Sequence, residues 1–476
     1  MKNLKSLTFN LVCLTLIGWL AITIWQYQTT VTPYAGSDYV TFYHALHGNR
    51  DIYENSSFTR PVKEKIIPGK SITTTYARET TSLNLNTPLM SLYLKGLINF
   101  SSQLSVNTAI WTAATFAGAA IGFWILLSFA TPVINTHTIL PLFFALLLCS
   151  FSLDNFYAGQ ISFFIFPILC LAFKFCHDKQ PPALAITLGM LAAMKLFFLV
   201  FLMFYLAKKE WRLSLIMMLS FVIFFFLPLL YFNHITYLHF FALTNQYSEF
   251  VLRSVKARNG SLLGFIGNLT YFLNSKITIQ QLRYIAYGVV AYFLVRSVIY
   301  DARVLQKLPA FSEELRFSLY IIIGLLCSPL AWIYYFVFLI VPIVVLFKIN
   351  QHYQLGKLFY CLVFFGLTLT AISYSAISLE KTYWLLCIRQ FCTFTTLLCW
   401  LIAFIIAASC IQEKKYRTDN ADNLLLPFYI FASSIAVIYI QIVCGKSYFL
   451  TWNKAEYIES MKPAQEVVTP KSGLPH

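Results

Sequence analysis

The sequence has 476 residues, of which 58% are hydrophobic and only 11% are charged. So few polar side chains cannot coat a soluble globule of this size, which excludes a soluble enzyme and leaves lipid as the solvent. The net charge is +16, but the Lys and Arg residues fall in short clusters between apolar runs. Such clusters are typical of cytoplasmic edges that face anionic lipid, so nucleic acid is not an expected partner.

Apolar runs long enough to cross a bilayer recur along the chain. Lys2 and Lys5 precede the first run, residues 7–25, which has no small-residue cleavage site after it and is expected to remain as a transmembrane helix. Further candidates are residues 109–129, 139–151, 161–175, 213–231, 284–298, 317–327, 331–347, 358–374, 384–408 and 424–443. The pattern predicts an all-α polytopic membrane protein of about a dozen transmembrane helices. Its membrane domain would be residues 1–444, with an extracytoplasmic tail at 445–476.

The basic clusters predict the topology of these spans. Counted over short loops, the positive-inside rule places in the cytoplasm Lys2/Lys5, Lys174/Lys179, Lys208/Lys209/Arg212, Arg303/Lys307, Lys348/Lys357 and Lys414/Lys415/Arg417. This holds only if residues 183–207 enter and leave on the same side. The stretch is too short for two spans, which predicts two half-helices meeting near Met194 and Lys195.

The same topology puts two long loops outside the membrane, residues 27–106 and 232–282. Amphipathic helices are expected in the first of them. Neither loop contains a Cys, so no disulfide framework is indicated.

Asp38 is the candidate for acid–base chemistry. Residues 36–48 mix apolar and polar side chains at roughly helical spacing, which predicts a helix on the membrane surface with Asp38 at its N-terminal end. A carboxylate there is suited to accept a proton from an acceptor hydroxyl, or it simply caps the helix. His44 and His47 lie three residues apart but lack a clear third ligand, so no metal is expected.

Several cations are candidates for binding a phosphate. Lys195 lies within an apolar run, where an ammonium is costly unless it meets an anion or water; the alternative is that it snorkels to the interface. Lys256 and Arg258 belong to a turn-prone basic cluster in the second outer loop, which suits a phosphate or is a solvated turn. Arg389, within a predicted span, would pair either with Glu380 or with a substrate phosphate.

A break between two apolar segments supplies aromatic candidates. Residues 327–335 read Cys-Ser-Pro-Leu-Ala-Trp-Ile-Tyr-Tyr, and Pro329 explains the break. Trp332, Tyr334 and Tyr335 are interpreted as interfacial belt residues or as a platform for a sugar ring.

Taken in order, these elements resemble glycosyltransferase family 87, from the first span to about residue 347. The set comprises Asp38, Asn86-Thr87-Pro88, Ala158-Gly159-Gln160, residues 189–195 leading into 208–212, Asn259-Gly260-Ser261 and residues 328–332. The chain departs from the family pattern at Tyr334-Tyr335, where His is frequent, and at Gly260, where Gln is common. It also reads Leu196-Phe197-Phe198 where a Pro commonly follows the intramembrane Lys.

The resemblance implies a GT-C-like bundle that moves a hexose, mannose above all, from a polyprenyl-phosphate donor to a lipid or glycan hydroxyl. Asp38 would be the general base, and no cofactor would be required. The resemblance assigns the donor phosphate to Lys195, Lys256, Arg258 and Arg389, and the sugar or acceptor to Gln160, Asn259, Ser261, Trp332, Tyr334 and Tyr335. The expected location is a bacterial inner membrane, with the site facing the periplasm. A polysaccharide polymerase or ligase, and a lipid-linked-sugar transporter, are the alternatives.

Overall fold

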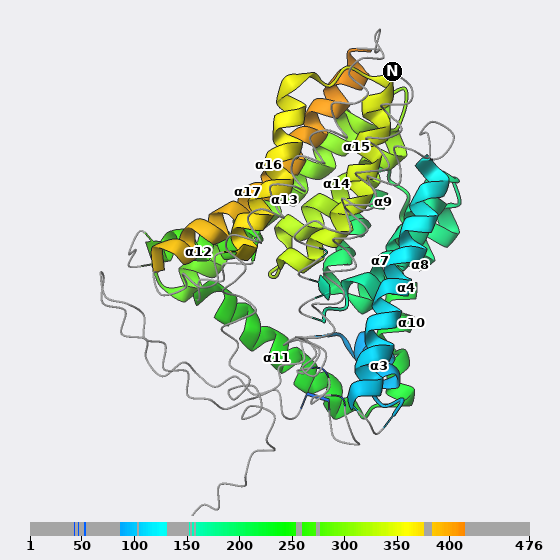
Figure 1. Cartoon of the computed structure of the whole chain (residues 1–476), viewed down its shortest axis with the longest axis vertical. Helices are drawn as coiled ribbons and strands as arrows, with labels where there is room; N and C mark the ends of the chain where they lie inside the picture. Colours follow the sequence, from blue (N-terminus) through cyan, green and yellow to red (C-terminus); the bar gives the residue numbers. More distant parts are fainter. Residues whose placement is uncertain are drawn as a thin grey trace, which may run out of the picture.

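The computed structural model describes residues 42, 46, 52–53, 86–101, 104–130, 152, 155–156, 159–253, 259–272, 277–375 and 383–414. Its elements are α-helices and short 3-10 helices, the latter labelled η (Figure 1). They run in the order α3 (Pro88–Ile98), α4 (Leu104–Ala130), α7 (Ser162–His177), α8 (Pro181–Met194), η2 (Leu196–Phe201), α9 (Leu202–Ala207), α10 (Trp211–Phe226), η3 (Leu227–Leu230), α11 (His234–Arg253), α12 (Leu262–Phe272), α13 (Ile279–Arg303), η4 (Leu305–Lys307), α14 (Ser312–Cys327), η5 (Ile333–Leu339), α15 (Ile340–His352), α16 (Gly356–Ser375) and α17 (Tyr383–Gln412). The spans predicted at 7–25, 139–151 and 424–443 lie outside the described residues.

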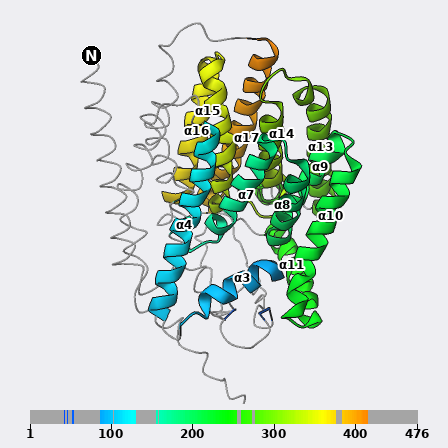
Figure 2. The same ribbon diagram turned by 90° about the vertical axis from the view of Figure 1, so that its right-hand side faces the viewer.

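The molecule is elongated, and its two ends differ. Helices α3 and α11 lie at the lower end in Figures 1 and 2, whereas α15 and α16 reach the upper end. The upper end carries cations from the clusters predicted to be cytoplasmic: Lys208 pairs with Glu313 at 2.7 Å, and Lys348 donates to the Phe129 carbonyl at 2.7 Å. We call this the basic end.

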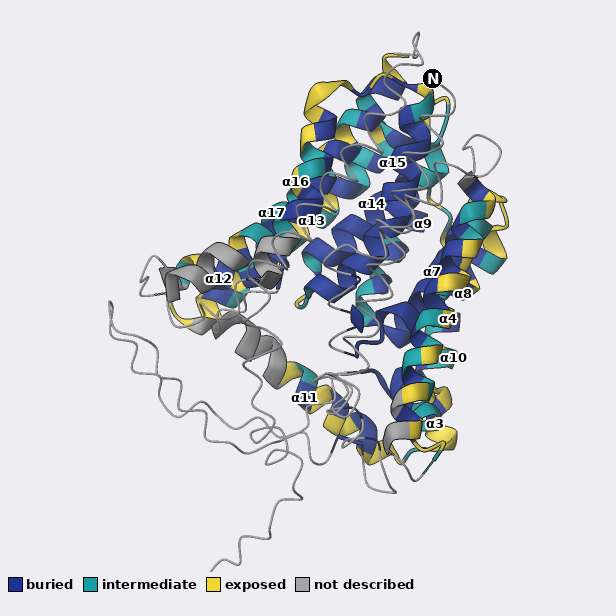
Figure 3. Cartoon of the chain, viewed as in Figure 1, coloured by how far each residue is buried: buried dark blue, intermediate teal, exposed yellow. Residues whose placement is uncertain are grey.

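Burial separates an inner layer of helices from an outer one. The apolar span Ile333–His352 is 94% buried, whereas Gln280–Lys307 is only 17% buried. Figure 3 shows the same contrast, with α14 and α15 almost wholly buried and exposed positions spread over α4 and α10. Large apolar side chains point outward from the outer helices, among them Trp124, Leu215 and Tyr284.

Such a surface is stable only in lipid, because helices that are apolar on every side need apolar surroundings. Within the described part of the chain, five helices are long and apolar enough to cross a membrane. The chain is therefore an all-α polytopic membrane protein, as its composition predicted.

The predicted spans that the structure describes match helices, but several boundaries moved, among them those of α13, which runs over Ile279–Arg303 where 284–298 was predicted. The span predicted from residue 317 begins at Ser312, because the polar first turn of α14 is paired: Glu313 binds Lys208 and Arg316. The span predicted from 331 begins with η5 at Ile333 and continues in α15 to His352. The predicted break lies between them, where Ser328 Oγ donates to the Leu330 carbonyl at 2.8 Å.

Residues 183–207 form the predicted pair of half-helices. Helix α8 ends at Met194, Lys195 is extended at φ −145° and ψ 113°, and η2 and α9 follow it. Both ends of the pair lie at the basic end. There Cys176, just before α8, contacts the Glu313 carbonyl, and Lys208, just after α9, pairs with the Glu313 carboxylate. The stretch therefore starts and finishes at the same end of the molecule, and its placement relative to a membrane stays a prediction.

Gly189 lets the entering half-helix pack closely against α10. A Cβ at this position would lie 2.5 Å from the Met217 carbonyl oxygen and 2.8 Å from the Phe221 nitrogen. Both atoms belong to the backbone and cannot rotate away, so any side chain at 189 forces α8 and α10 apart.

Gly189→Ala is expected to destabilise the protein by about 1–3 kcal/mol through overpacking. The matched control is Gly288→Ala on α13, where a Cβ would meet nothing within 4 Å. That change should be neutral, or stabilising by up to about 1 kcal/mol through helix propensity. Thermal unfolding in detergent measures both, and equal melting temperatures for the two variants would contradict the packing argument.

Candidate active site

The site is built around the break at Lys195. In a continuous helix the Met194 carbonyl would accept from the amide four residues on, which is that of Phe198. That amide instead donates to the Lys195 carbonyl at 3.1 Å. Thr87 Oγ1 replaces it, donating to the Met194 carbonyl at 3.0 Å. A hydroxyl from the start of α3 therefore satisfies the backbone group that the break leaves open.

The Lys195 side chain is buried, with 9% of its surface exposed. Its Nζ donates to Asn86 Oδ1 at 3.0 Å and to the Tyr335 hydroxyl at 2.9 Å. Asn86 lies immediately before α3, and Tyr335 lies in η5. Three segments distant in the sequence thus meet at one ammonium group.

Three aromatic rings, those of Tyr335, Tyr334 and Trp332, follow one another beside Lys195, and we call this row the aromatic wall. Tyr335 and Tyr334 meet edge to face with centroids 4.7 Å apart, and Tyr334 stacks on Trp332 at 6.1 Å and 15°. Trp332 is half-buried, so part of its indole is accessible. Flat rings of this kind suit the apolar face of a sugar.

Asn259 and Ser261 fix the break that carries Trp332. Asn259 Oδ1 accepts from the Ala331 amide at 2.9 Å, and the Gly260 amide donates to the Ala331 carbonyl at 2.8 Å. Ser261 Oγ donates to the Pro329 carbonyl at 3.2 Å. Both side chains are fully buried, so these bonds give them a scaffolding role; their predicted contact with the sugar stays a prediction.

Gly260, one of the departures from the family pattern, has a steric reason here. A Cβ would lie 2.9 Å from both Phe336 Cζ and the Thr393 carbonyl oxygen. The space that a glutamine side chain would need is filled by η5 and α17. The departure therefore reflects local packing in this chain.

Gln160 connects to the same wall through its backbone. Its amide donates to the Asn155 carbonyl at 2.9 Å, and Asn155 Nδ2 donates to the Tyr334 carbonyl at 3.4 Å. The predicted site residues whose side chains the structure describes thus form one connected cluster around Lys195 and η5. This cluster consists of Gln160, Lys195, Asn259, Ser261, Trp332, Tyr334 and Tyr335.

Other predicted site residues are not placed. Asp38, Lys256 and Arg258 lie outside the described residues, as do His44 and His47. Arg389 lies within α17, but its side chain is not described. Among the residues that are described, no three His, Cys, Asp or Glu side chains gather closely enough to hold a metal ion.

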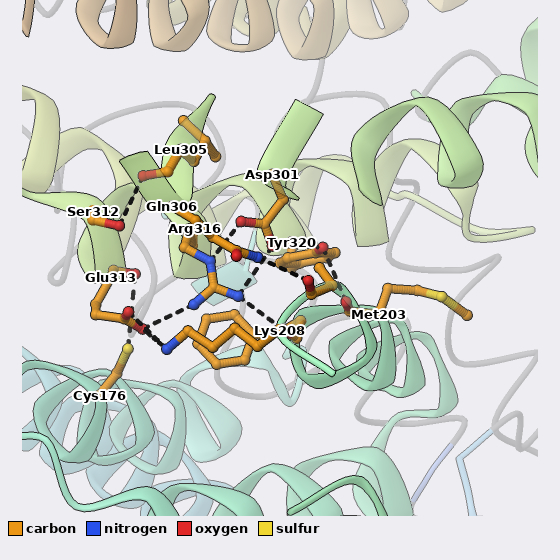
Figure 4. A network of polar contacts seen from close by, with 12 residues as sticks. Cys176, Met203, Lys208, Asp301, Leu305, Gln306, Ser312, Glu313, Arg316 and Tyr320 are labelled. Atoms are coloured by element: carbon orange, nitrogen blue, oxygen red, sulfur yellow. Dashed lines mark hydrogen bonds and ion pairs between the residues drawn. The ribbon is translucent and has the colours of Figure 1, made fainter. Parts of the chain in front are cut away.

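A second polar cluster binds the C-terminal end of α9, the second of the two half-helices (Figure 4). Its centre is Arg316, which is fully buried and pairs through Nε with the fully buried Asp301. Arg316 also donates to the Phe204 carbonyl at 2.8 Å, and Gln306 donates to the Ala207 carbonyl at 3.0 Å. The last carbonyls of a helix have no partners within it, so these bonds complete the end of α9.

The sequence analysis did not identify three residues of these two clusters: Arg316 and Asp301 at the end of α9, and Asn86 beside Lys195. Arg316 was detectable by the rule that singled out Lys195, since it lies four residues into an apolar helix, but the predicted span began just after it. Asp301 lies in the last turn of α13, beside the cluster already counted as cytoplasmic. Asn86 stood in a recognised motif, but nothing in the sequence connects it to Lys195.

The arrangement is suited to binding a phosphate-borne sugar. A buried ammonium gives a fixed positive charge where water is scarce, and electrostatic attraction to an anion is strong in such surroundings. Aromatic rings and amide groups lie next to this ammonium and can contact a less polar part of the same ligand. The geometry therefore offers contacts for an anion with an attached ring.

The model of Glycosyltransferase family 87 matches residues 88–329, just over half of the chain. The match begins with α3 and ends at Pro329, so it contains Lys195, Asn259 and Ser261 and stops before Trp332. No curated protein matches the chain.

Removing Arg316 alone should be more harmful than removing it together with Asp301. Arg316→Met leaves a buried carboxylate without its cation, which is expected to cost about 3–5 kcal/mol. Replacing both charges, with Asp301→Leu and Arg316→Met, removes that penalty and should recover part of the stability. Unfolding in detergent measures this, and a double variant no more stable than Arg316→Met would contradict it.

Proposed function

The chain belongs to glycosyltransferase family 87, and we propose that it transfers a hexose, mannose above all, from a polyprenyl-phosphate donor to a hydroxyl of a lipid or glycan acceptor. One observation carries the proposal beyond the family. The buried Lys195 ammonium lies at a helix break, in contact with Tyr335 and next to the rings of Tyr334 and Trp332. A fixed cation beside an aromatic wall is what a sugar phosphate ester requires.

In the proposed reaction the acceptor oxygen attacks the anomeric carbon of the donor sugar. The new glycosidic bond forms as the bond from that carbon to the phosphate oxygen breaks, and the hydroxyl proton passes to Asp38. Polyprenyl phosphate leaves with the bonding electron pair. Direct displacement of this kind inverts the anomeric centre.

Lys195 would stabilise the charge that develops on the leaving phosphate, with Lys256, Arg258 and Arg389 as further cations. No proton needs to be supplied to this leaving group, because a phosphate monoester is stable as an anion. Two residues that follow Asp38 in its predicted helix are described, and both are buried. Phe42 packs 6.1 Å from Trp111, and the Leu46 carbonyl accepts from Asn99 at 3.2 Å.

We also propose that the protein resides in a bacterial inner membrane with the site facing the periplasm. The basic end would then face the cytoplasm, as the positive-inside rule predicts. Lys195 lies at the tip of the half-helix pair that starts and finishes at the basic end, which turns the site toward the opposite side.

Asp38→Asn is expected to lower kcat by about 10²-fold or more, because the amide cannot accept the hydroxyl proton. The assay uses purified full-length protein in liposomes with polyprenyl-phosphate mannose and an alkyl mannoside acceptor. Asp178→Asn is the control, since Asp178 pairs with Lys174 at the basic end. Equal turnover by Asp38→Asn and wild type would eliminate Asp38 as the base, and movement of intact donor without transfer would favour a transporter.

Lys195→Met should weaken binding of polyprenyl phosphate by about 30-fold or more, the loss expected for a buried cation in contact with an anion. Lys348→Met is a matched control, because Lys348 is equally buried but binds the Phe129 carbonyl at the basic end. Binding is measured with the purified variants in nanodiscs. The same affinity in both variants would remove Lys195 from the phosphate site.

A further inference from the structure

The segment that pairs with Trp332 is also bound from helix α17. Gln390 lies in this helix and is fully buried, and its Nε2 donates to the Asn259 carbonyl at 3.0 Å. Asn259 in turn forms an isolated antiparallel bridge with Trp332. One residue, Asn259, therefore connects Gln390 to the aromatic wall, although Gln390 lies 131 residues away from it in the sequence.

The Gln390 side chain is fixed from α12 as well. Asn268 Nδ2 donates to Gln390 Oε1 at 3.0 Å, so the Gln390 amide accepts at one end and donates at the other. About one turn away on the same two helices, Phe265 and Phe394 stack with centroids 4.2 Å apart and an angle of 10°. A buried amide that is bound at both ends has little freedom to move, so α12 and α17 together hold the Asn259 backbone.

The short segment that begins at Asn259 lies between two sets of partners. The Asn259 side chain binds the Pro329 carbonyl at 3.2 Å and the Ala331 amide at 2.9 Å, whereas its carbonyl binds Gln390. A buried carbonyl without a partner is costly. If Gln390 lost its amide, the segment would have to shift toward another donor, and Trp332 would move with it.

We propose that Gln390 is a positioning residue for the donor sugar, which sets the place of Trp332 in the aromatic wall through the Asn259 backbone. The inference rests on the proposed function and deepens it, because it assigns part of the recognition of the sugar to α17. This helix lies beyond residues 88–329, which the family model matches. Gln390 does not touch the sugar, and its effect passes through Asn259.

A purely structural role for Gln390 makes a different prediction. If the amide only stabilised the fold, its loss would weaken every ligand of the site alike. If it positions Trp332, its loss would weaken binding of the sugar more than binding of the lipid phosphate. The deciding quantity is the dissociation constant of polyprenyl phosphate divided by that of polyprenyl-phosphate mannose, which we call the sugar preference. The two lipids differ only in the sugar.

The experiment measures the sugar preference and thermal unfolding of wild type, Gln390→Met, Asn268→Leu and Trp332→Leu, as full-length protein in nanodiscs without an acceptor. Methionine is unbranched and adaptable, so it fills the space of a glutamine without its hydrogen bonds. Asn268→Leu removes only the support from α12. Asn350→Leu is the control, because Asn350 is a buried amide at the basic end, where it accepts from the Tyr360 hydroxyl at 2.8 Å.

We expect Gln390→Met to lower the sugar preference by about fivefold or more, which corresponds to about 1 kcal/mol. Asn268→Leu should lower it by less, and Asn350→Leu should lower the melting temperature without changing it. In the transfer assay, Gln390→Met should raise the KM for the donor more than it lowers kcat. A sugar preference equal to that of wild type in both Gln390→Met and Asn268→Leu overturns the proposal.

This outcome is distinguishable from failure of the proposed function. If wild type neither binds polyprenyl-phosphate mannose nor transfers its sugar, the function itself is wrong. If wild type transfers the sugar and Trp332→Leu lowers the sugar preference, while Gln390→Met keeps it, only the role of Gln390 is wrong. An unchanged sugar preference in Trp332→Leu also overturns the inference, but it leaves the transfer reaction in place.

Discussion

A hydrocarbon environment leaves no water to complete an interrupted helix, and this constraint governs the arrangement around Lys195. The chain meets it with side chains from elsewhere. Thr87 donates a hydrogen bond to the Met194 carbonyl at the break. Carbonyls of α9 accept hydrogen bonds from Arg316, Gln306 and Tyr320. A pair of half-helices is stable here because both of its irregular ends are covered by protein.

The contacts that stabilise the helix break also accommodate the charge of Lys195. At the tip, Lys195 leaves the helix in an extended conformation, so its side chain reaches toward Asn86 and Tyr335 instead of lying along the helix surface. The break is not caused by a local Pro or Gly, since Met194 is followed by Lys195, Leu196 and Phe197. Long-range contacts stabilise it, and Lys195 lies where they converge.

Much of this architecture was predictable from the sequence, and the reasons are physical. Charge counting alone required residues 183–207 to turn back, because lysines on both sides had to share one face of the membrane. Apolar length gave the positions of the described spans, and Pro329 indicated the break before η5. These signals are local, so a single sequence carries them.

The contacts that complete the site were not predictable in this way. Asn86 and Tyr335 lie 109 and 140 residues from Lys195, and no local pattern relates them. Asn259 and Ser261 were expected as ligand contacts, yet their polar atoms bind the backbone around Pro329. A polar residue in a motif can serve the fold or the substrate, and only its neighbours decide between these roles.

The Asp301–Arg316 pair has a consequence for how the protein is made. Each charge is costly in a bilayer until it meets the other, and a short connection joins α13 to α14, which favours insertion of the two helices together as a hairpin. The carbonyl of Phe204, which Arg316 also binds, is synthesised 112 residues earlier. The hydrogen bonds that complete the half-helix pair therefore cannot all form until α14 has been synthesised, long after the pair itself.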